Sequence, residues 1–310
     1  MRGVYFNDGE VELREVGEAA GDGIRVQARS IGICGTDLHM LEMKFPLKCI
    51  AGHEVAGVLD DGTPVAVEPI APCNQCDYCR SGDYNLCRAA AATTLGIGCD
   101  GCMADELRVP QRCLVYLPSN VDVKDACLIE PLAVAVHGMR RAGLAANQRV
   151  AVIGGGTIGL CAVAVASDSG AETGLAARYE HQTVAGKLLG AAPIDGKYDL
   201  VAECTGSKDA IKQAVDLCRP GGRVLLLGTY WEGVSLSIVV MLKEITLVSS
   251  YMYSASGAVR DFDVAATLLS RNPDIARVMI THRFPLAEAK RAFAVARDRK
   301  SGAIKVVLEP

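Results

Sequence analysis

Up to about residue 120 the chain alternates short apolar runs with breaks rich in glycine and aspartate, and no long helical period appears. Apolar and β-branched residues in runs of this length, bounded by turn-forming residues, are typical of strands. The runs that show this best are residues 24–31, 54–59, 65–68 and 106–110. The pattern predicts an irregular, β-rich domain.

After about residue 123 the pattern changes, and segments with strand and helix character alternate. A helix is predicted over 132–141. The strands that follow are expected at 150–153, 173–177, 198–203, 223–227 and 245–250, and the helices between them at 157–167, 181–189 and 208–218. Alternation at this spacing is typical of βαβ units, so we predict an α/β domain with a doubly wound parallel sheet. Helices at 261–270 and 286–297 and a strand at 304–308 complete the prediction.

Length and composition indicate a globular protein of two domains. At 310 residues the chain exceeds the usual size of a single core, and its 50% hydrophobic and 22% charged residues exclude disorder. The net charge of −4 includes no block of like charges, which argues against a nucleic-acid partner or a membrane surface. No apolar run approaches a membrane span and no secretory signal is recognisable, so the 13 cysteines fit a reducing cytoplasm.

The strand-like run at 150–153 leads directly into Gly154, Gly156 and Gly159, which have the spacing G-x-G-x-x-G. The first glycine permits a tight turn, the second lets the backbone approach a pyrophosphate, and the third allows close helix–strand packing. The N–H groups at the start of the next helix, near Thr157 and Ile158, hold the anion. Because strand, glycines and helix occur in the required order, we predict a dinucleotide site here.

The end of the second predicted strand of this domain bears on the choice of cofactor. Proteins that bind NAD usually place an acidic residue there, about 20 residues on, to hold the ribose 2′-hydroxyl. This chain has Ala176, Ala177, Arg178 and Tyr179 instead. Small residues followed by an arginine leave room for a 2′-phosphate and offer a guanidinium to bind it, so we predict NADP(H) in preference to NAD(H). The alternative is that Arg178 is an ordinary solvated side chain.

Two groups of residues have the chemistry of metal ligands. Cys73, Cys76, Cys79 and Cys87 lie within fifteen residues, and four thiolates close a tetrahedral zinc site completely, which predicts a structural ion. The alternative is a set of buried free thiols. Cys34, His53 and Glu54 offer one thiolate, one imidazole and one carboxylate, which leave zinc an open position. Glu130, before Pro131, is a further carboxylate at the predicted domain junction.

These motifs together resemble the zinc-dependent medium-chain alcohol dehydrogenases, in the branch that includes sorbitol and threonine dehydrogenases. The resemblance covers essentially the whole chain and rests on residues 34–39, 52–54, the four cysteines at 73–87, residues 130–133 and the glycines at 154–159. It implies an α/β protein with a β-rich GroES-like catalytic domain at 1–131 and 278–310, and a Rossmann domain at 132–277. It also implies a catalytic zinc on Cys34 and His53, with the third ligand from Glu54 or Glu130.

The resemblance further implies hydride transfer between a nicotinamide cofactor and a secondary alcohol or polyol and its carbonyl form. Thr36 is expected to hydrogen-bond the substrate oxygen, and His39 to pass the proton towards solvent, although capping and surface roles are the alternatives. A homodimer or homotetramer is expected, with apolar edge strands at 223–227, 235–240 and 246–250. Other hypotheses are a zinc-free quinone or enoyl reductase and a non-catalytic nucleotide-binding protein, which would not need the three open-site ligands.

Two features leave the prediction open. Only 18 residues separate Cys34 from His53, fewer than is usual in the family, which shortens a stretch that in the family borders the substrate cleft. Cys99 and Cys102 form another close pair, for which incidental free thiols are preferred over a third metal or a redox site.

Overall fold

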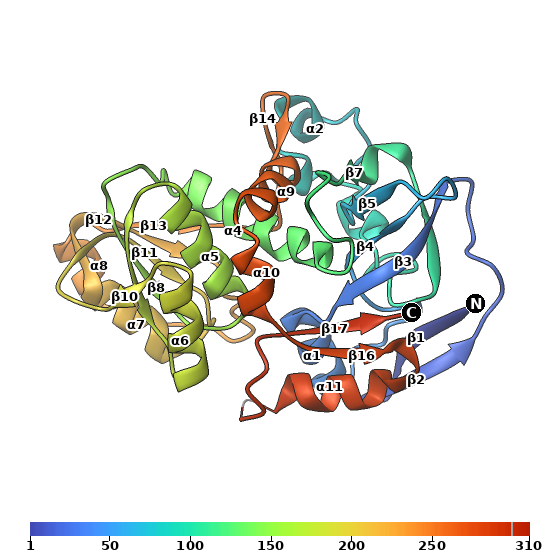
Figure 1. Ribbon diagram of the computed structural model, residues 1–310. Coiled ribbons are helices and arrows are strands. Elements are labelled where there is room, and N and C mark those ends of the chain that lie inside the picture. The colour runs from blue at the N-terminus through green and yellow to red at the C-terminus, as the bar shows by residue number, and fades with distance from the viewer. Residues whose placement is uncertain (299) are drawn as a thin grey trace. The chain divides into compact units, whose positions relative to one another are not determined.

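The computed structural model describes residues 1–298 and 300–310, which divide into two compact units (Figure 1). The first unit comprises Met1–Glu130 and Ser254–Pro310, and the second comprises Pro131–Tyr253. The chain leaves the first unit within one residue of the predicted position but returns to it at Ser254, earlier than the predicted residue 278. The helix that follows Ser254 packs on strands of the first unit, so these residues belong to that unit.

The first unit is built on a seven-stranded mixed sheet with the order β16-β17-β3-β4-β5-β7, in which β6 also pairs with β3. Its strands are β3 (Ile24–Gly32), β4 (Glu54–Val58), β5 (Pro64–Val67), β6 (Glu106–Val109), β7 (Leu114–Tyr116), β16 (Ile280–Pro285) and β17 (Lys305–Glu309). Two hairpins accompany it, β1 (Arg2–Asn7) with β2 (Glu10–Glu15), and β14 (Ala255–Ser256) with β15 (Val259–Arg260). The alternating side chains of these strands bury the core of the unit.

Helices and helical turns surround this sheet. They are α1 (Gly35–Glu42), α2 (Asp77–Ser81), η1 (Tyr84–Leu86), α3 (Ala90–Thr93), η2 (Gln111–Cys113), η3 (Ala126–Leu128), α9 (Asp261–Arg271), α10 (Asp274–Met279), η4 (Leu286–Glu288) and α11 (Ala289–Arg297). Helix α11 packs on β2, β16 and β17, and α9 packs on β7 and β15 (Figure 1). The contacts of α9 explain why the residues after Ser254 belong to the first unit.

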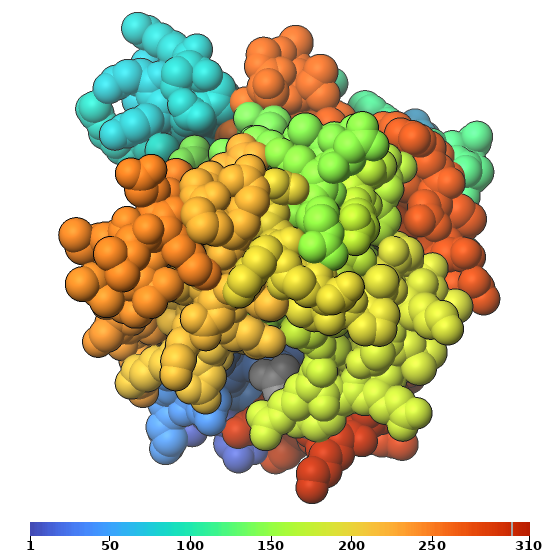
Figure 2. Space-filling view, turned by 90° about the vertical axis from the view of Figure 1, so that its left-hand side faces the viewer, coloured from blue at the N-terminus to red at the C-terminus, as the bar shows by residue number. Residues whose placement is uncertain are grey.

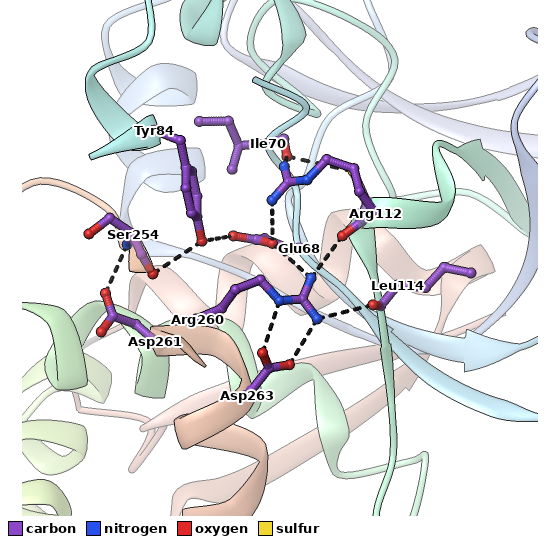
Figure 3. A network of polar contacts seen from close by, with 10 residues as sticks. Glu68, Ile70, Tyr84, Arg112, Leu114, Ser254, Arg260, Asp261 and Asp263 are labelled. Carbon is purple, nitrogen blue, oxygen red and sulfur yellow. Dashed lines mark hydrogen bonds and ion pairs between the residues drawn. The ribbon is translucent and has the colours of Figure 1, made fainter. Parts of the chain in front are cut away.

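A buried carboxylate fastens this returning segment to the sheet. Glu68, directly after β5, accepts hydrogen bonds from Arg112 Nη2 at 2.9 Å, from Arg260 Nη1 at 3.2 Å and from the Tyr84 hydroxyl (Figure 3). Tyr84 also donates to Ser254 O at 3.1 Å. Burial raises the pKa of Glu68, and the two guanidinium groups oppose that shift. The network joins segments that lie almost 200 residues apart, since Glu68 and Arg260 are separated by 192 positions.

The second unit is a parallel six-stranded sheet with the order β10-β9-β8-β11-β12-β13 (Figure 1). Its strands are β8 (Arg149–Ile153), β9 (Glu172–Ala176), β10 (Ala192–Pro193), β11 (Tyr198–Glu203), β12 (Cys218–Leu226) and β13 (Thr246–Ser249). Its helices are α4 (Ile129–Arg141), α5 (Thr157–Asp168), α6 (Glu180–Leu188), α7 (Lys208–Leu217) and α8 (Val239–Leu242). The strand order reverses direction between β8 and β11, which is where such sheets bind ligands. The doubly wound prediction is confirmed.

The prediction of three apolar edge strands is wrong in two places. Residues 223–227 largely coincide with the end of β12, which lies between β11 and β13 and is no edge. Residues 235–240 form no strand but lead into α8, and Ile238, Met241 and Leu242 remain more than two-thirds exposed. Of the three predicted runs, only 246–250 corresponds to a strand at the end of the order, β13. Figure 2 shows this side of the unit, with the gold and orange residues of β12 to β13 on its surface.

Among the described residues, no helix is long and apolar enough to cross a membrane.

Candidate metal and nucleotide sites

Cys34, His53 and Glu54 come together in the first unit, and we call them the buried triad. Their potential ligand atoms all lie within 4.8 Å of one another. Cys34 is the N-cap of α1, where its Sγ accepts from Thr36 N at 3.4 Å. His53 directly follows Gly52, whose φ of +91° makes the required turn, and Glu54 is the first residue of β4. A thiolate, an imidazole and a carboxylate at these distances fit zinc with one coordination position left for a substrate.

The carboxylate of Glu54 is paired with a fully buried lysine. Lys305 Nζ lies 2.8 Å from Glu54 Oε1 and 2.6 Å from Oε2, and it also donates to Ile33 O at 3.1 Å. Both side chains are 1% exposed. Burial alone would lower the pKa of Lys305, but the negative charges of Glu54 and Cys34 raise it above its ordinary value. The lysine therefore stays cationic and compensates the negative charge that the triad concentrates in the core.

A second carboxylate, that of Asp37, lies near the imidazole of His53. His53 Nδ1 lies 3.9 Å from Asp37 Oδ1, and among the described residues neither atom has a hydrogen-bond partner. Asp37 Oδ2 accepts from Cys34 N at 2.9 Å, which completes a capping box at α1. Burial raises the pKa of Asp37. Asp37 is therefore placed to act on the imidazole through its charge, without the hydrogen bond that usually orients a metal-ligating histidine.

The other residues predicted for this site lie nearby with different exposure. Glu130 is buried in the first turn of α4, and its charge contributes to raising the pKa of His53, but among the described residues it is not a member of the group within 4.8 Å. Thr36 and His39 are both half-buried in α1, Thr36 in its first turn and His39 in its last. The backbone N–H of Thr36 donates to Cys34 Sγ, so this residue lies next to the buried triad.

Cys73, Cys76, Cys79 and Cys87 form the second metal group, which we call the cysteine cluster. Their sulfur atoms all lie within 4.8 Å of one another, with Cys76 Sγ 3.5 Å and Cys73 Sγ 3.9 Å from Cys79 Sγ. Backbone N–H groups lower the pKa of Cys73 and Cys76, whereas burial and the neighbouring thiols raise that of Cys79 to about 12. The cluster fits a tetrahedral ion with no open position. Cys99 and Cys102 belong to neither group within the described residues.

The glycine-rich loop has the geometry that its spacing predicts. Gly154 has a φ of +105°, and Gly156 is the N-cap of α5. A Cβ on Gly159 would collide with the carbonyl oxygen of Gly154, so only glycine allows the helix to approach the strand this closely. Thr157 and Ile158 follow as the first residues of α5, and the N–H groups at the start of a helix are suited to hold a pyrophosphate.

Arg178 and Tyr179 follow the end of β9. Arg178 is exposed, and its guanidinium lies 5.8 Å from the centre of the Tyr179 ring. The Tyr179 ring in turn stacks on His181, with ring centres 5.7 Å apart and an interplanar angle of 16°. Arg178 thus lies two residues after the end of β9 with its guanidinium near an aromatic ring, and no acidic residue stands at that strand end.

Comparison with known proteins places this architecture in a family. The model of the alcohol dehydrogenase GroES-like domain matches residues 20–119, and that of the glucose dehydrogenase C-terminus matches residues 123–309. The chain is 32% identical to an L-galactonate-5-dehydrogenase of Escherichia coli, covering 84% of each chain. It is 30% identical to a sorbitol dehydrogenase of Halalkalibacterium halodurans, covering 93% of this chain and 91% of the relative.

Solved structures agree. A zinc-binding dehydrogenase from Sinorhizobium meliloti bound to NADP has a TM-score of 0.88 at 28% identity and covers 100% of this chain and 99% of its own. A galactitol-1-phosphate dehydrogenase from Escherichia coli has a TM-score of 0.88 at 27% identity, with 100% of both chains covered. The chain belongs to the zinc-type medium-chain alcohol and polyol dehydrogenases. It is an oxidoreductase that uses zinc and a nicotinamide cofactor.

Sequence reasoning missed Asp37 and Lys305 at this site. Asp37 had a local signal, because it stands three positions after Cys34 and completes the capping box. Lys305 had none, since 251 positions separate it from Glu54 and its strand reads as an ordinary closing strand.

Proposed function

We propose that the protein interconverts a secondary alcohol group of a polyol and the corresponding ketone, with NADP(H) as the preferred cofactor. The observation that carries this proposal is the buried triad, whose three different donors leave a position open. The names of the relatives support polyol chemistry, since they include dehydrogenases of sorbitol, galactonate and galactitol-1-phosphate. A zinc-free reductase would have no use for this donor set.

In this proposal two zinc ions are bound. The cysteine cluster holds a structural ion, and Cys34 and His53 hold the catalytic one. Glu54 is the third ligand that its distance to the other two donors supports, while Glu130 stands close enough to influence His53 and remains the alternative. Zinc bound at the triad supplies Lewis acidity, which makes an alcohol proton easier to remove.

The residues of the chain then manage the proton and the orientation of the substrate. Thr36 accepts the proton of the substrate hydroxyl in a hydrogen bond, because it lies two residues after Cys34, in the first turn of α1. His39, in the last turn of α1, passes that proton towards solvent. The nicotinamide supplies the hydride acceptor.

We infer the preference for NADP(H) from Arg178 and Tyr179, together with the missing acid at the end of β9. Replacing Ala177 with Asp together with Arg178→Gln tests this directly. We expect kcat/KM for NADP⁺ to fall and that for NAD⁺ to rise, so that their ratio shifts by more than about tenfold. An unchanged ratio would contradict the preference.

A second copy of this chain is the partner that we propose for the edge strand β13. The strand has a neighbour on one side only within the described sheet, and apolar side chains of α8 lie exposed shortly before it in the chain. A dimer or tetramer measured by sedimentation supports this assignment, and a monomer at micromolar concentration contradicts it. Among the described residues the cysteines form no disulfide, and we propose a reducing cytoplasm as the location.

Metal analysis combined with a substrate panel tests the function as a whole. The purified protein is expected to contain about two zinc ions per subunit and to reduce NADP⁺ in the presence of polyols. Sorbitol, xylitol, galactitol and simple secondary alcohols, each with NADP⁺ and NAD⁺, form the panel. Protein without zinc, or zinc-loaded protein that turns over none of these alcohols nor their ketones, would overturn the proposal.

A further inference from the structure

Glu203, the last residue of β11, carries a completely buried carboxylate that no motif of the family description uses. Its exposure is 0%. Oε1 accepts from Thr205 N at 2.6 Å, from Thr205 Oγ1 at 2.5 Å and from Gly206 N at 3.1 Å, and Oε2 accepts from the Tyr230 hydroxyl at 2.6 Å. A buried charge is tolerated only with donors of this kind, and here every donor lies in a loop.

The donors belong to two different loops of the second unit. Thr205 and Gly206 follow β11, and Tyr230 follows β12. The backbone oxygen of Glu203 strengthens the same link, because it accepts from Leu227 N at 2.8 Å and from Gly228 N at 2.9 Å. One residue therefore ties both loops together.

The two loops are packed against each other without spare room. A Cβ on Gly206 would collide with Thr229 O, and a Cβ on Gly228 would lie 2.8 Å from Glu203 Oε2. Burial and the bond to Glu203 raise the pKa of Tyr230, so its hydroxyl stays a donor to the carboxylate. The position of each loop is thus set by the other and by Glu203.

The loop after β11 also touches the glycine-rich loop. A Cβ on Gly154 would lie 2.7 Å from Thr205 Cγ2, so the methyl group of Thr205 packs on the first glycine of the dinucleotide motif. In sheets of this kind the dinucleotide lies across the carboxyl ends of the strands. Its adenosine ribose is read at the end of β9, which leaves the ends of β11 and β12 for the nicotinamide half.

We propose that Glu203 is a positioning residue for the cofactor, which joins the loops after β11 and β12 into one wall against the nicotinamide half. The inference rests on the proposed dinucleotide site. It differs from a purely structural role because it predicts a selective loss: contacts to the nicotinamide half weaken, and those to the adenosine half do not.

The sharpest variant is Tyr230→Phe, which removes the hydroxyl that ties the second loop and leaves the bonds of the first loop in place. Its matched control is Tyr198→Phe, because Tyr198 is also buried in the second unit but lies at the opposite end of β11, where its hydroxyl accepts from Asp195 N at 2.7 Å. Glu203→Gln is the stronger variant. Asp199→Asn is its control, since Asp199 accepts from Arg149 N at 2.8 Å near the start of the same strand.

Dissociation constants are measured for NADPH, from its fluorescence, and for 2′,5′-ADP, which lacks the nicotinamide half. We expect Tyr230→Phe to weaken NADPH about three- to tenfold, and Glu203→Gln to weaken it further, with 2′,5′-ADP within about twofold of the native value in both. Tyr198→Phe and Asp199→Asn should lower the Tm without changing either constant. NADH and AMP form the corresponding pair if the native protein binds NADH more tightly.

The outcomes are distinct. Equal weakening of both nucleotides, or a lower Tm with both constants unchanged, would overturn the role of Glu203 while leaving the dinucleotide site intact. Native protein that binds neither NADPH nor NADH would overturn the proposed function itself, and the inference with it.

Discussion

The buried triad and the cysteine cluster both fit zinc, but the chain builds them in opposite ways. The cysteine cluster comes from one continuous segment of fifteen residues, and three of its four thiols are partly exposed. The buried triad takes Cys34 from a helix cap, His53 from the residue before β4 and Glu54 from the first position of β4. It depends on Lys305 of β17, which is 251 positions from Glu54 in the sequence. Four ligands from one local segment are enough for a closed structural metal site. The buried site with an open coordination position instead takes its residues from segments far apart in the sequence.

The two sites also differ in the groups that compensate the charge of their ligands. Backbone N–H groups stabilise the thiolates of the cysteine cluster, for example those of Gln75 and Cys76 at Cys73. The buried triad has a lysine and a second carboxylate instead, with Lys305 on Glu54 and Asp37 behind His53. The cysteine cluster therefore relies on its ion for most of its cohesion, whereas protein groups already hold the buried triad.

The largest expected effect separates catalysis from folding. Cys34→Ser removes a ligand of the open site, so we expect turnover of the best polyol to fall more than about 100-fold because zinc is lost or misplaced. Far-ultraviolet circular dichroism and the Tm should stay close to those of the native protein. Native-like turnover in this variant would remove the buried triad from catalysis.

Lys305→Met tests the charge compensation of the buried triad. The change leaves Glu54 buried without its counter-ion, which is expected to cost about 3–5 kcal/mol of unfolding free energy. Urea denaturation measures the loss, and Lys305→Arg is the matched control because it keeps a cation at the position. A Met variant as stable as the native protein would show that Glu54 does not need the lysine.

Cys79→Ser tests the cysteine cluster. Removing one of four ligands is expected to destabilise the lobe by more than about 2 kcal/mol and to release one zinc ion per subunit, with a lower Tm and impaired assembly. The zinc of the buried triad should remain. If the Cys34 and Cys79 variants were both well folded and only the Cys79 change removed activity, the two sites would have to exchange their assigned roles.

Asp37→Asn is the mildest test. The neutral side chain keeps the bond to Cys34 N but weakens the field behind His53, so the affinity of the catalytic zinc should fall about 10- to 100-fold. Competition with a chromophoric chelator measures the affinity of each ion separately. The zinc of the cysteine cluster serves as the internal control, and equal losses at both ions would point to general destabilisation.

Much of the second unit could be predicted from the sequence because its signals are local. The predicted strand 198–203 agrees with β11 at both ends, and the helix predicted at 157–167 differs from α5 by one residue. The first unit gave weaker signals. The hairpin of β1 and β2 was not predicted, since Glu10–Glu15 is mostly exposed and shows no buried stripe.

The errors arise where tertiary contacts decide. The run 235–240 is apolar enough for a strand, but it has no neighbouring strand in the described sheet. The return to the first unit at Ser254 depends on Arg260 reaching Glu68, a contact between residues 192 positions apart. The metal ligands could be predicted from the sequence because their spacing and residue types are local signals. Lys305 could not be predicted, because its contact with Glu54 exists only in the folded sheet.

The place of β17 beside β3 also has a consequence for how the protein is made. Glu54 and Lys305 are 251 positions apart in the sequence. At about 5–20 residues per second, a ribosome therefore adds the lysine to the chain roughly 10–50 s after the glutamate. Through that interval a nascent chain can assemble its cysteine cluster, whose ligands are translated together. The catalytic centre is complete only after β17 has been synthesised. An unfinished chain can therefore acquire structural zinc while its active site is still incomplete.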